Sequence, residues 1–257
     1  MGIAMQLFRR AVALLSIAGS VACGGSPEAP TAVAVALSAT ADTAHFVFHY
    51  APTDSVDAPR QEAFYDWFTP LFGITAAPRI QYYKHPTRSH LLALTGQNTN
   101  GFADTSTSTI HTIWPFEPHE AIHIYTATIG RPTDFFNEGI AVGLSTDPMA
   151  GRFVPWWNAQ PVDAVVRGLR STGRVPALAA IAATTPFRAL DDQISYPTAG
   201  SFLAFVVDRY GIESTKAFFR SGARDDEIDR IRTTFQTAFG VGFEAAEQAW
   251  LLHVDAQ

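Results

Sequence analysis

The chain is poor in cysteine and in basic residues, and each shortage excludes a class of function. The sequence contains one cysteine, Cys23, in 257 residues, so no disulfide forms within the chain and thiol catalysis is excluded for the folded domain. Basic residues are also scarce, because 18 Lys and Arg face 24 Asp and Glu and the formal net charge is −6. With no basic stripe and no glycine-rich phosphate loop in the sequence, nucleic acid is not an expected partner.

The composition is that of a folded protein. Hydrophobic residues make up 47% of the chain and charged residues only 16%, which is typical of a globular domain and not of a disordered one. The length allows one domain or two closely packed lobes. No internal repeat is visible.

The N-terminal residues have the pattern of an export signal. A basic pair, Arg9-Arg10, precedes an apolar run over residues 11–22, and this order predicts a signal peptide over 1–22. The run is too short to cross a bilayer as a helix of the mature protein. Cys23 follows small residues, which resembles the lipobox of bacterial lipoproteins and implies a lipid anchor at that thiol. Ser20 departs from the aliphatic residue usual there, so plain secretion is the alternative.

A tether and a folded domain are expected after the signal. Residues 23–44 begin with Cys23 and continue through a stretch rich in Ala, Thr, Val and Ser, to which we assign no structure. The folded domain is expected over 45–257. The predicted location is therefore extracytoplasmic, with contact to the membrane only through the lipid on Cys23.

The strongest chemical signal is the segment His119-Glu120-Ala121-Ile122-His123. Residues four apart in a helix lie one turn apart on the same face, so both imidazoles can reach one ion. Glu120 projects to the side of that pair, where a carboxylate can take a proton from a water molecule instead of binding the metal. The pattern is typical of zinc hydrolases. The alternative is a helix whose histidines are only surface or core residues.

A catalytic zinc ion needs a third protein ligand and an open fourth position. Glu138 follows His123 after 14 residues, within the segment 137–141, Asn-Glu-Gly-Ile-Ala. The apolar spacing of this segment and Leu144 predicts a second helix. Asp134 is the nearest competing ligand, and its alternative role is that of a helix N-cap.

At these two motifs the chain resembles the gluzincin clan of zinc metallopeptidases, in which an Asn-Glu-Gly-x-Ala helix supplies the third ligand. The resemblance implies that His119, His123 and Glu138 bind one Zn²⁺ ion. It extends to residues 196–211, predicted to be a buried helix, because the clan has a similar stretch whose leading tyrosine donates its hydroxyl to the tetrahedral intermediate. Tyr196 stands at that position, and its alternative is a residue that only packs at a helix N-terminus.

The remaining segments complete an α+β pattern. Strands are predicted over 45–50, 79–84 and 109–114, and helices over 63–71, 162–169 and two closing segments from residue 228 onward. A short Ala-rich piece near 177–183 gives only a weak signal. Residues 96–109 are predicted to be a loop. The resemblance implies that the strand over 109–114 is a sheet edge that lines the cleft.

Several further aromatic and histidine residues are assigned no role in the site. His85 and His90 are expected at the surface, and His111 is expected to be a half-exposed strand residue. Trp156 and Trp157 are expected to be core or lobe-packing residues and not a binding platform.

The sequence and the resemblance together predict an α+β zincin of the thermolysin-like type. A small N-terminal lobe would carry a sheet and the zinc helix, and a helical C-terminal lobe would face it across a cleft. The expected activity is hydrolysis of peptide bonds, with Glu120 as general base and Tyr196 as oxyanion stabiliser. The Gly-x-Met-Glu-Asn element of aminopeptidases is absent from the sequence, which favours an endopeptidase acting on a peptide or protein substrate. The alternative is a non-catalytic, zinc-containing envelope protein that binds a protein partner in the cleft.

Overall fold

The fold is seen in a computed structural model, which describes residues 35–150 and 153–257. The compact unit begins at Val35, earlier than residue 45, where the sequence places the start of the domain. The predicted export signal, Cys23 and most of the tether lie outside the described residues. In the described part of the chain, no helix is long and apolar enough to cross a membrane.

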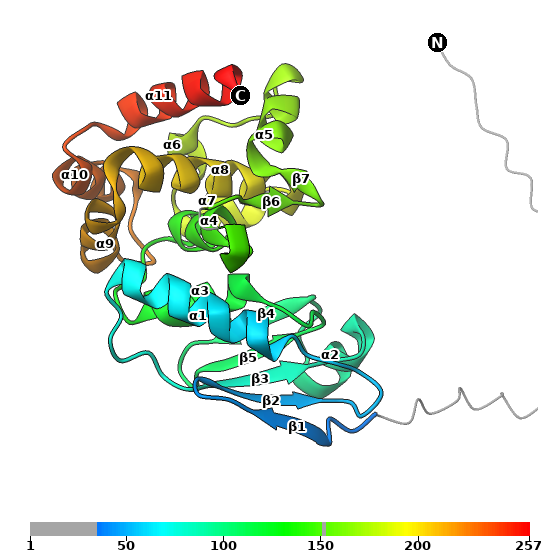
Figure 1. Cartoon of the computed structure of the whole chain (residues 1–257). Helices are drawn as coiled ribbons and strands as arrows, with labels where there is room; N and C mark the ends of the chain where they lie inside the picture. Colours follow the sequence, from blue (N-terminus) through cyan, green and yellow to red (C-terminus); the bar gives the residue numbers. More distant parts are fainter. Residues whose placement is uncertain (1–34, 151–152) are drawn as a thin grey trace, which may run out of the picture. The chain divides into compact units, whose positions relative to one another are not determined.

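The N-terminal half is built on a five-stranded mixed sheet in the order β1-β2-β3-β5-β4 (Figure 1). Its strands are β1 (Ala39–Asp42), β2 (Phe46–Tyr50), β3 (Ile80–Lys84), β4 (Gly101–Asp104) and β5 (Thr109–Thr112). β2, β3 and β5 run parallel to one another, and β1 and β4 pair antiparallel at the two ends. β1 lies in the segment to which the sequence assigned no structure.

The expectation that residues 109–114 form the sheet edge is wrong. β5 lies between β3 and β4, so the edge is β4, in the segment expected to be a loop. Residues 96–109 are mostly small and polar, the glycines and asparagines among them have low strand propensity, and no alternation of apolar and polar residues is present, so the local pattern did not indicate a strand. The strand β4 is instead stabilised by its antiparallel pairing with β5.

One face of the sheet packs against the hydrophobic core. Phe48, Tyr82 and Ile110 are neighbours in the register of β2, β3 and β5, and all three are fully buried. Helices α1 (Ala58–Phe72) and α3 (Pro118–Ala127) pack with the sheet and with each other, as Figure 1 shows. α1 ends at Gly73, whose φ of 63° is the left-handed conformation that favours glycine at a helix end.

The C-terminal region is mostly helical. The C-terminal region contains α4 (Asp134–Leu144), η1 (Pro148–Ala150), β6 (Trp156–Trp157), β7 (Gln160–Pro161), α5 (Val162–Ser171), α6 (Leu178–Ile181), α7 (Thr184–Ala189), α8 (Asp192–Tyr210), α9 (Ile212–Ser221), α10 (Ile228–Phe239) and α11 (Phe243–Ala256). The remaining helix, α2 (Arg88–Thr95), lies between β3 and β4 in the N-terminal half. The helices expected from apolar periodicity are present. α8 begins before Tyr196, and the short α7 and the longer α9 were not predicted.

α4 and α8 form the closest helix pair of this region. A Cβ atom added at Gly143 would lie 2.6 Å from the backbone oxygen of Gly200, and one added at Gly139 would lie 2.8 Å from that of Ala199. Only glycine allows the two backbones to approach so closely. This contact places Glu138 and Tyr196, which belong to different helices, on the same side of the pair.

Candidate metal centre

The two histidines of the motif are presented by α3. Pro118 occupies the first turn, where its missing N–H costs nothing, and the side chain of Glu117 caps the helix by accepting a hydrogen bond from the backbone N–H of His119 at 3.2 Å. His119 and His123 therefore lie one turn apart on one face. The side chain of His119 is 23% exposed and that of His123 is 9% exposed, so one ring reaches the surface and the other lies at the floor of the site.

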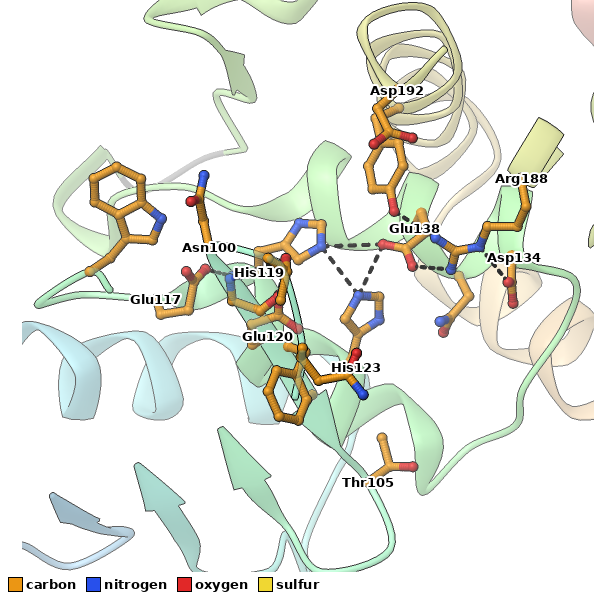
Figure 2. Close-up of a pocket in the computed structure, with 18 of the residues that line it drawn as sticks. Asn100, Thr105, Glu117, His119, Glu120, His123, Asp134, Glu138, Arg188 and Asp192 are labelled. Atoms are coloured by element: carbon orange, nitrogen blue, oxygen red, sulfur yellow. Dashed lines mark hydrogen bonds and ion pairs between the residues drawn. The ribbon is translucent and has the colours of Figure 1, made fainter. Parts of the chain in front are cut away.

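Glu138, on α4, meets both rings (Figure 2). Its Oε2 lies 3.2 Å from His123 Nε2 and 3.3 Å from His119 Nε2, and the two ring nitrogens are 3.2 Å apart. Ligand atoms bonded to a tetrahedral zinc ion at about 2.0 Å are separated by about 3.3 Å, so this triangle has the dimensions of three corners of such a site. Two imidazoles and one carboxylate are also a donor set that suits zinc.

The protonation of these groups reflects their close approach. Burial lowers the pKa of His119, but the hydrogen bond to Glu138 and the charge of Glu120 outweigh burial and raise it above 6.5. Burial raises the pKa of Glu138, but the charges of His123 and His119 and their hydrogen bonds bring it well below its usual range. Because a ligating imidazole must be deprotonated, a metal ion that binds here displaces a proton when the pH is below the pKa of His119.

Glu120 lies beside the triangle. Its carboxylate, with the nitrogens of His119 and His123, belongs to a group of atoms within 4.8 Å of one another, and these three residues could hold a metal ion. Burial raises the pKa of Glu120 to about 8, and the Glu117 carboxylate adds to the rise while His119 opposes it. A dication in the site would lower that pKa, because it stabilises the nearby carboxylate.

Sequence reasoning missed two residues that shape the surroundings of Glu120. Glu117 is buried, and its Oε2 accepts a hydrogen bond from Thr112 Oγ1 at 3.0 Å. A Cβ atom at Gly101 would lie 3.3 Å from Glu120 Oε1, so the start of β4 passes directly over the carboxylate. Gly101 stands in a segment rich in polar residues, where no periodic pattern marked it.

A third residue missed from the sequence, Arg188 of α7, reaches into the site. It donates hydrogen bonds to Glu138 Oε1 at 2.6 Å, to Asp134 Oδ2 at 2.6 Å and to Tyr196 Oη at 2.7 Å. Asp134 also accepts from Arg224 at 2.9 Å. The competing interpretation of Asp134 as a metal ligand is therefore wrong, because its carboxylate is taken by two guanidinium groups. It is also not the N-cap of α4, which is Thr133.

Tyr196 lies on the wall of the same cavity. Burial and the charge of Glu138 raise the pKa of its hydroxyl, so it remains protonated at neutral pH, although Arg188 opposes this shift. Trp157 stacks on Tyr196 with ring centroids 5.6 Å apart and lines the cavity. The expectation that Trp156 and Trp157 are packing residues is thus wrong, since Trp156 is 53% exposed and Trp157 faces the site.

The cavity has a volume of about 730 Å³ and is open to solvent. Residues 97–103, at the edge strand, line it on the sheet side, residues of α3, α4, α7 and α8 line it opposite, and side chains such as Arg88, Trp157 and Arg224 complete the wall. The wall is mostly polar, with both acidic and basic side chains.

The other histidines named from the sequence lie elsewhere. His85 is buried, contrary to the expectation of a surface residue, and it lies 3.0 Å from ring nitrogens of both His90 and His111. The conclusion that His111 is half-exposed is confirmed. Its ring stacks between Tyr83 and Phe102 on the sheet. Strand position alone could not show that three histidines distant in sequence would meet.

No protein-family model matches the chain, and comparison with curated proteins gives no match either. What can be said of its chemistry therefore depends on the site itself: a buried His-Glu-His group that could bind a metal, in an α+β fold with a helical C-terminal region.

Proposed function

We propose that this protein is a zinc-dependent metallopeptidase of the gluzincin type, with one Zn²⁺ ion bound by His119, His123 and Glu138. The observation that carries the proposal is the triangle of donor atoms, with edges of 3.2, 3.2 and 3.3 Å, beside the Glu120 carboxylate. Three ligands leave the fourth position free, as catalytic zinc sites require.

The residues around this position match the steps of amide hydrolysis. A bound zinc ion supplies Lewis-acid polarisation of the scissile carbonyl and of a water molecule. Glu120 takes the proton of the attacking water and then gives it to the leaving amine. Tyr196 keeps its proton at neutral pH and donates a hydrogen bond to the oxyanion that forms.

A peptide is the substrate that best suits the cavity. β4 is the edge of the sheet, and Gly101, Phe102 and Ala103 of this strand line the cavity. The outer side of an edge strand presents main-chain groups that can pair with an extended peptide, which would carry a scissile bond past the metal. Because the cavity is open to solvent, we propose cleavage within a chain.

The direct test is to separate metal binding from proton transfer. Glu120→Gln should keep one zinc per chain but lower the turnover of an unstructured protein by about 10²- to 10⁴-fold, because the base is lost. Tyr196→Phe should lower kcat by about 10²- to 10³-fold with little change in KM. Glu213→Gln, at an exposed glutamate of α9, is the matched control.

The outcomes of this test are distinct. If both variants keep wild-type proteolysis, the activity belongs to another site or to a contaminant. If the wild type binds zinc but hydrolyses no peptide, and Glu120→Gln captures the same protein partner as the wild type, the chain is the zinc-containing binding protein named as the alternative.

We also propose that the protein is exported and held at the cell envelope by a lipid on Cys23. The support is the sequence pattern alone, because these residues lie outside the described part. In a bacterial host, labelled fatty acid should enter the wild-type protein, and Cys23→Ala should release it from membranes. A soluble, unlabelled wild type would favour plain secretion.

A further inference from the structure

Arg188 uses each of its three guanidinium nitrogens for a different acceptor. Nε donates to Asp134 Oδ2 at 2.6 Å, Nη2 to Glu138 Oε1 at 2.6 Å and Nη1 to Tyr196 Oη at 2.7 Å. The guanidinium is planar and rigid, so bonds in three directions fix the relative positions of the three acceptors. A residue of α7 thus links two residues of α4 to one of α8.

The bond to Glu138 determines which of its oxygens is free. Oε1 is taken by Arg188, and Oε2 is the atom that faces His119 and His123. A carboxylate held in this way offers one oxygen to an ion at the centre of the triangle. Without Arg188, both oxygens could turn toward the ion and occupy the position that a water molecule needs.

The bond to Tyr196 determines the direction of its proton. A guanidinium group can only donate hydrogen bonds, so the Tyr196 oxygen must be the acceptor. The hydroxyl proton is then free to point away from Arg188 and into the cavity. The same side chain therefore holds the third ligand and leaves the phenol as a donor.

Arg188 is itself held in place by Asp134. The Asp134 side chain is 4% exposed and accepts hydrogen bonds from both Arg188 and Arg224. Arg224 donates to Asp134 from Nε and Nη2, and these two bonds do not involve Glu138 or Tyr196. The two arginines share Asp134 as a partner and both line the cavity, but of the two it is Arg188 that donates to Glu138 and Tyr196, which makes Arg224 a matched control.

We propose that Arg188 is a positioning residue that keeps Glu138 monodentate and directs the Tyr196 hydroxyl as a donor. The proposal rests on the proposed function, since it assigns Arg188 a role toward the metal ligand and the oxyanion. It concerns a residue that carries no motif in the sequence and does not touch the reacting atoms.

The test measures metal affinity by competition with a chelator. Arg188→Gln should weaken zinc binding about 10- to 100-fold, as loss of a group that orients a ligand typically does. Arg188→Lys keeps the positive charge, which protects folding, but its donors all sit on one nitrogen at the end of a flexible stem and cannot replace three nitrogens fixed in one plane, so we expect a similar loss. Arg224→Gln should stay within about twofold of the wild type.

A second readout follows the coordination itself. Cobalt(II) substituted for zinc should show the intense visible bands of a four-coordinate site in the wild type and in Arg224→Gln. In Arg188→Gln these bands should weaken as Glu138 binds through both oxygens. With zinc saturating, Arg188→Gln should lower kcat while KM changes little. The Tyr196 hydroxyl would no longer be directed at the oxyanion, and that hydrogen bond is made only in the transition state.

The possible failures point to different conclusions. A wild-type protein that takes up no zinc would overturn the proposed function. A zinc-binding wild type whose affinity and cobalt spectrum are unchanged in Arg188→Gln would overturn the role of Arg188 alone. Wild-type behaviour of Arg188→Lys would show that only the charge matters and would also overturn the positioning role.

Discussion

The nitrogen atoms of two histidine groups in this protein are arranged in opposite ways. In the first group, His119 and His123 direct one ring nitrogen each at the same point, with Glu138 Oε2 as the third corner. In the second, His85 lies between two other rings, and its two nitrogens face different neighbours at 3.0 Å. The first arrangement converges on a point, whereas the second forms a chain.

The chain of three histidines satisfies its own hydrogen bonds. His90 Nε2 lies 2.7 Å from the backbone oxygen of Val35, which can only accept, so this nitrogen carries a proton. With neutral rings, His85 then donates to His90 Nδ1, and His111 donates to His85 Nε2. Every nitrogen that lies between two of these rings is paired, and the three rings direct no common set of lone pairs at one point.

In the converging group, donors and acceptors do not follow one another from ring to ring. Two imidazole nitrogens 3.2 Å apart and a carboxylate oxygen are directed at the same space, and a cation that replaces the protons between them would bind all three atoms at once. Among the described residues, the group of His, Cys, Asp and Glu found able to hold a metal is His119, Glu120 and His123. The number of histidines in a cluster thus matters less than the direction of their nitrogens.

Removing one ring from each group should give the largest difference in zinc binding between two variants. His123→Ala removes a proposed ligand and should lower zinc affinity by more than about a hundredfold, more than the loss of a supporting group. His111→Gln, in the chain of histidines, should leave one zinc per chain. Metal analysis after gel filtration checks both variants, with circular dichroism as the control for folding. Equal zinc in both would contradict the distinction.

Lowering the pH should weaken metal binding at the converging group. Hydrogen bonding to Glu138 raises the pKa of His119 above 6.5 despite its burial, so below that pKa a proton must leave before zinc binds. Affinity should fall by about tenfold per pH unit for each proton displaced. Chelator competition at pH 8 and pH 6 measures this slope. Affinity that does not change with pH would show that the rings are not ligands.

Protonation of the chain of histidines at low pH should instead lower the free energy of unfolding. Burial lowers the pKa of His85 to about 4, and the charges of His111, His90 and Lys84 add to the effect. Because the unfolded state takes up a proton near pH 6.5 and the folded state does so only near pH 4, stability should be complete above 6.5 and decrease as the pH falls toward 4. The loss at pH 5 should be about 1 to 2 kcal/mol.

Urea unfolding at pH 7 and pH 5 measures this loss. His85→Gln removes the titrating ring and should show a smaller difference between the two pH values. His49→Gln, on the same face of the sheet, is the control and should behave like the wild type. If His85→Gln and the wild type lose the same stability, the pH dependence comes from other groups.

Much of the fold was accessible from periodicity. The segments that became β2, β3, α1, α4, α5, α8, α10 and α11 all show apolar spacing of the correct period, and that spacing reflects burial against a core. β1 and β4 were missed because they are short, polar strands at the two ends of the sheet, stabilised by pairing with a neighbour more than by their own composition. α7 is too short to show a period.

The sequence by itself determined the local half of the candidate site. The spacing of His119 and His123 places both rings on one face of any helix they share, and Pro118 suits the first turn of that helix, because these relations depend only on helix geometry. The resemblance to the gluzincin pattern added Glu138 and Tyr196. Neither inference required knowledge of how the helices pack.

Only the tertiary structure decided which distant groups meet. Glu138 reaches the histidines because α4 lies beside α3, and Tyr196 faces the same cavity because Gly143 and Gly200 let α4 and α8 approach closely. Arg188 joins them from a segment with no motif at all. Contacts across the chain depend on packing, and packing is a property of the whole core, whereas spacing within one helix is fixed by the covalent chain.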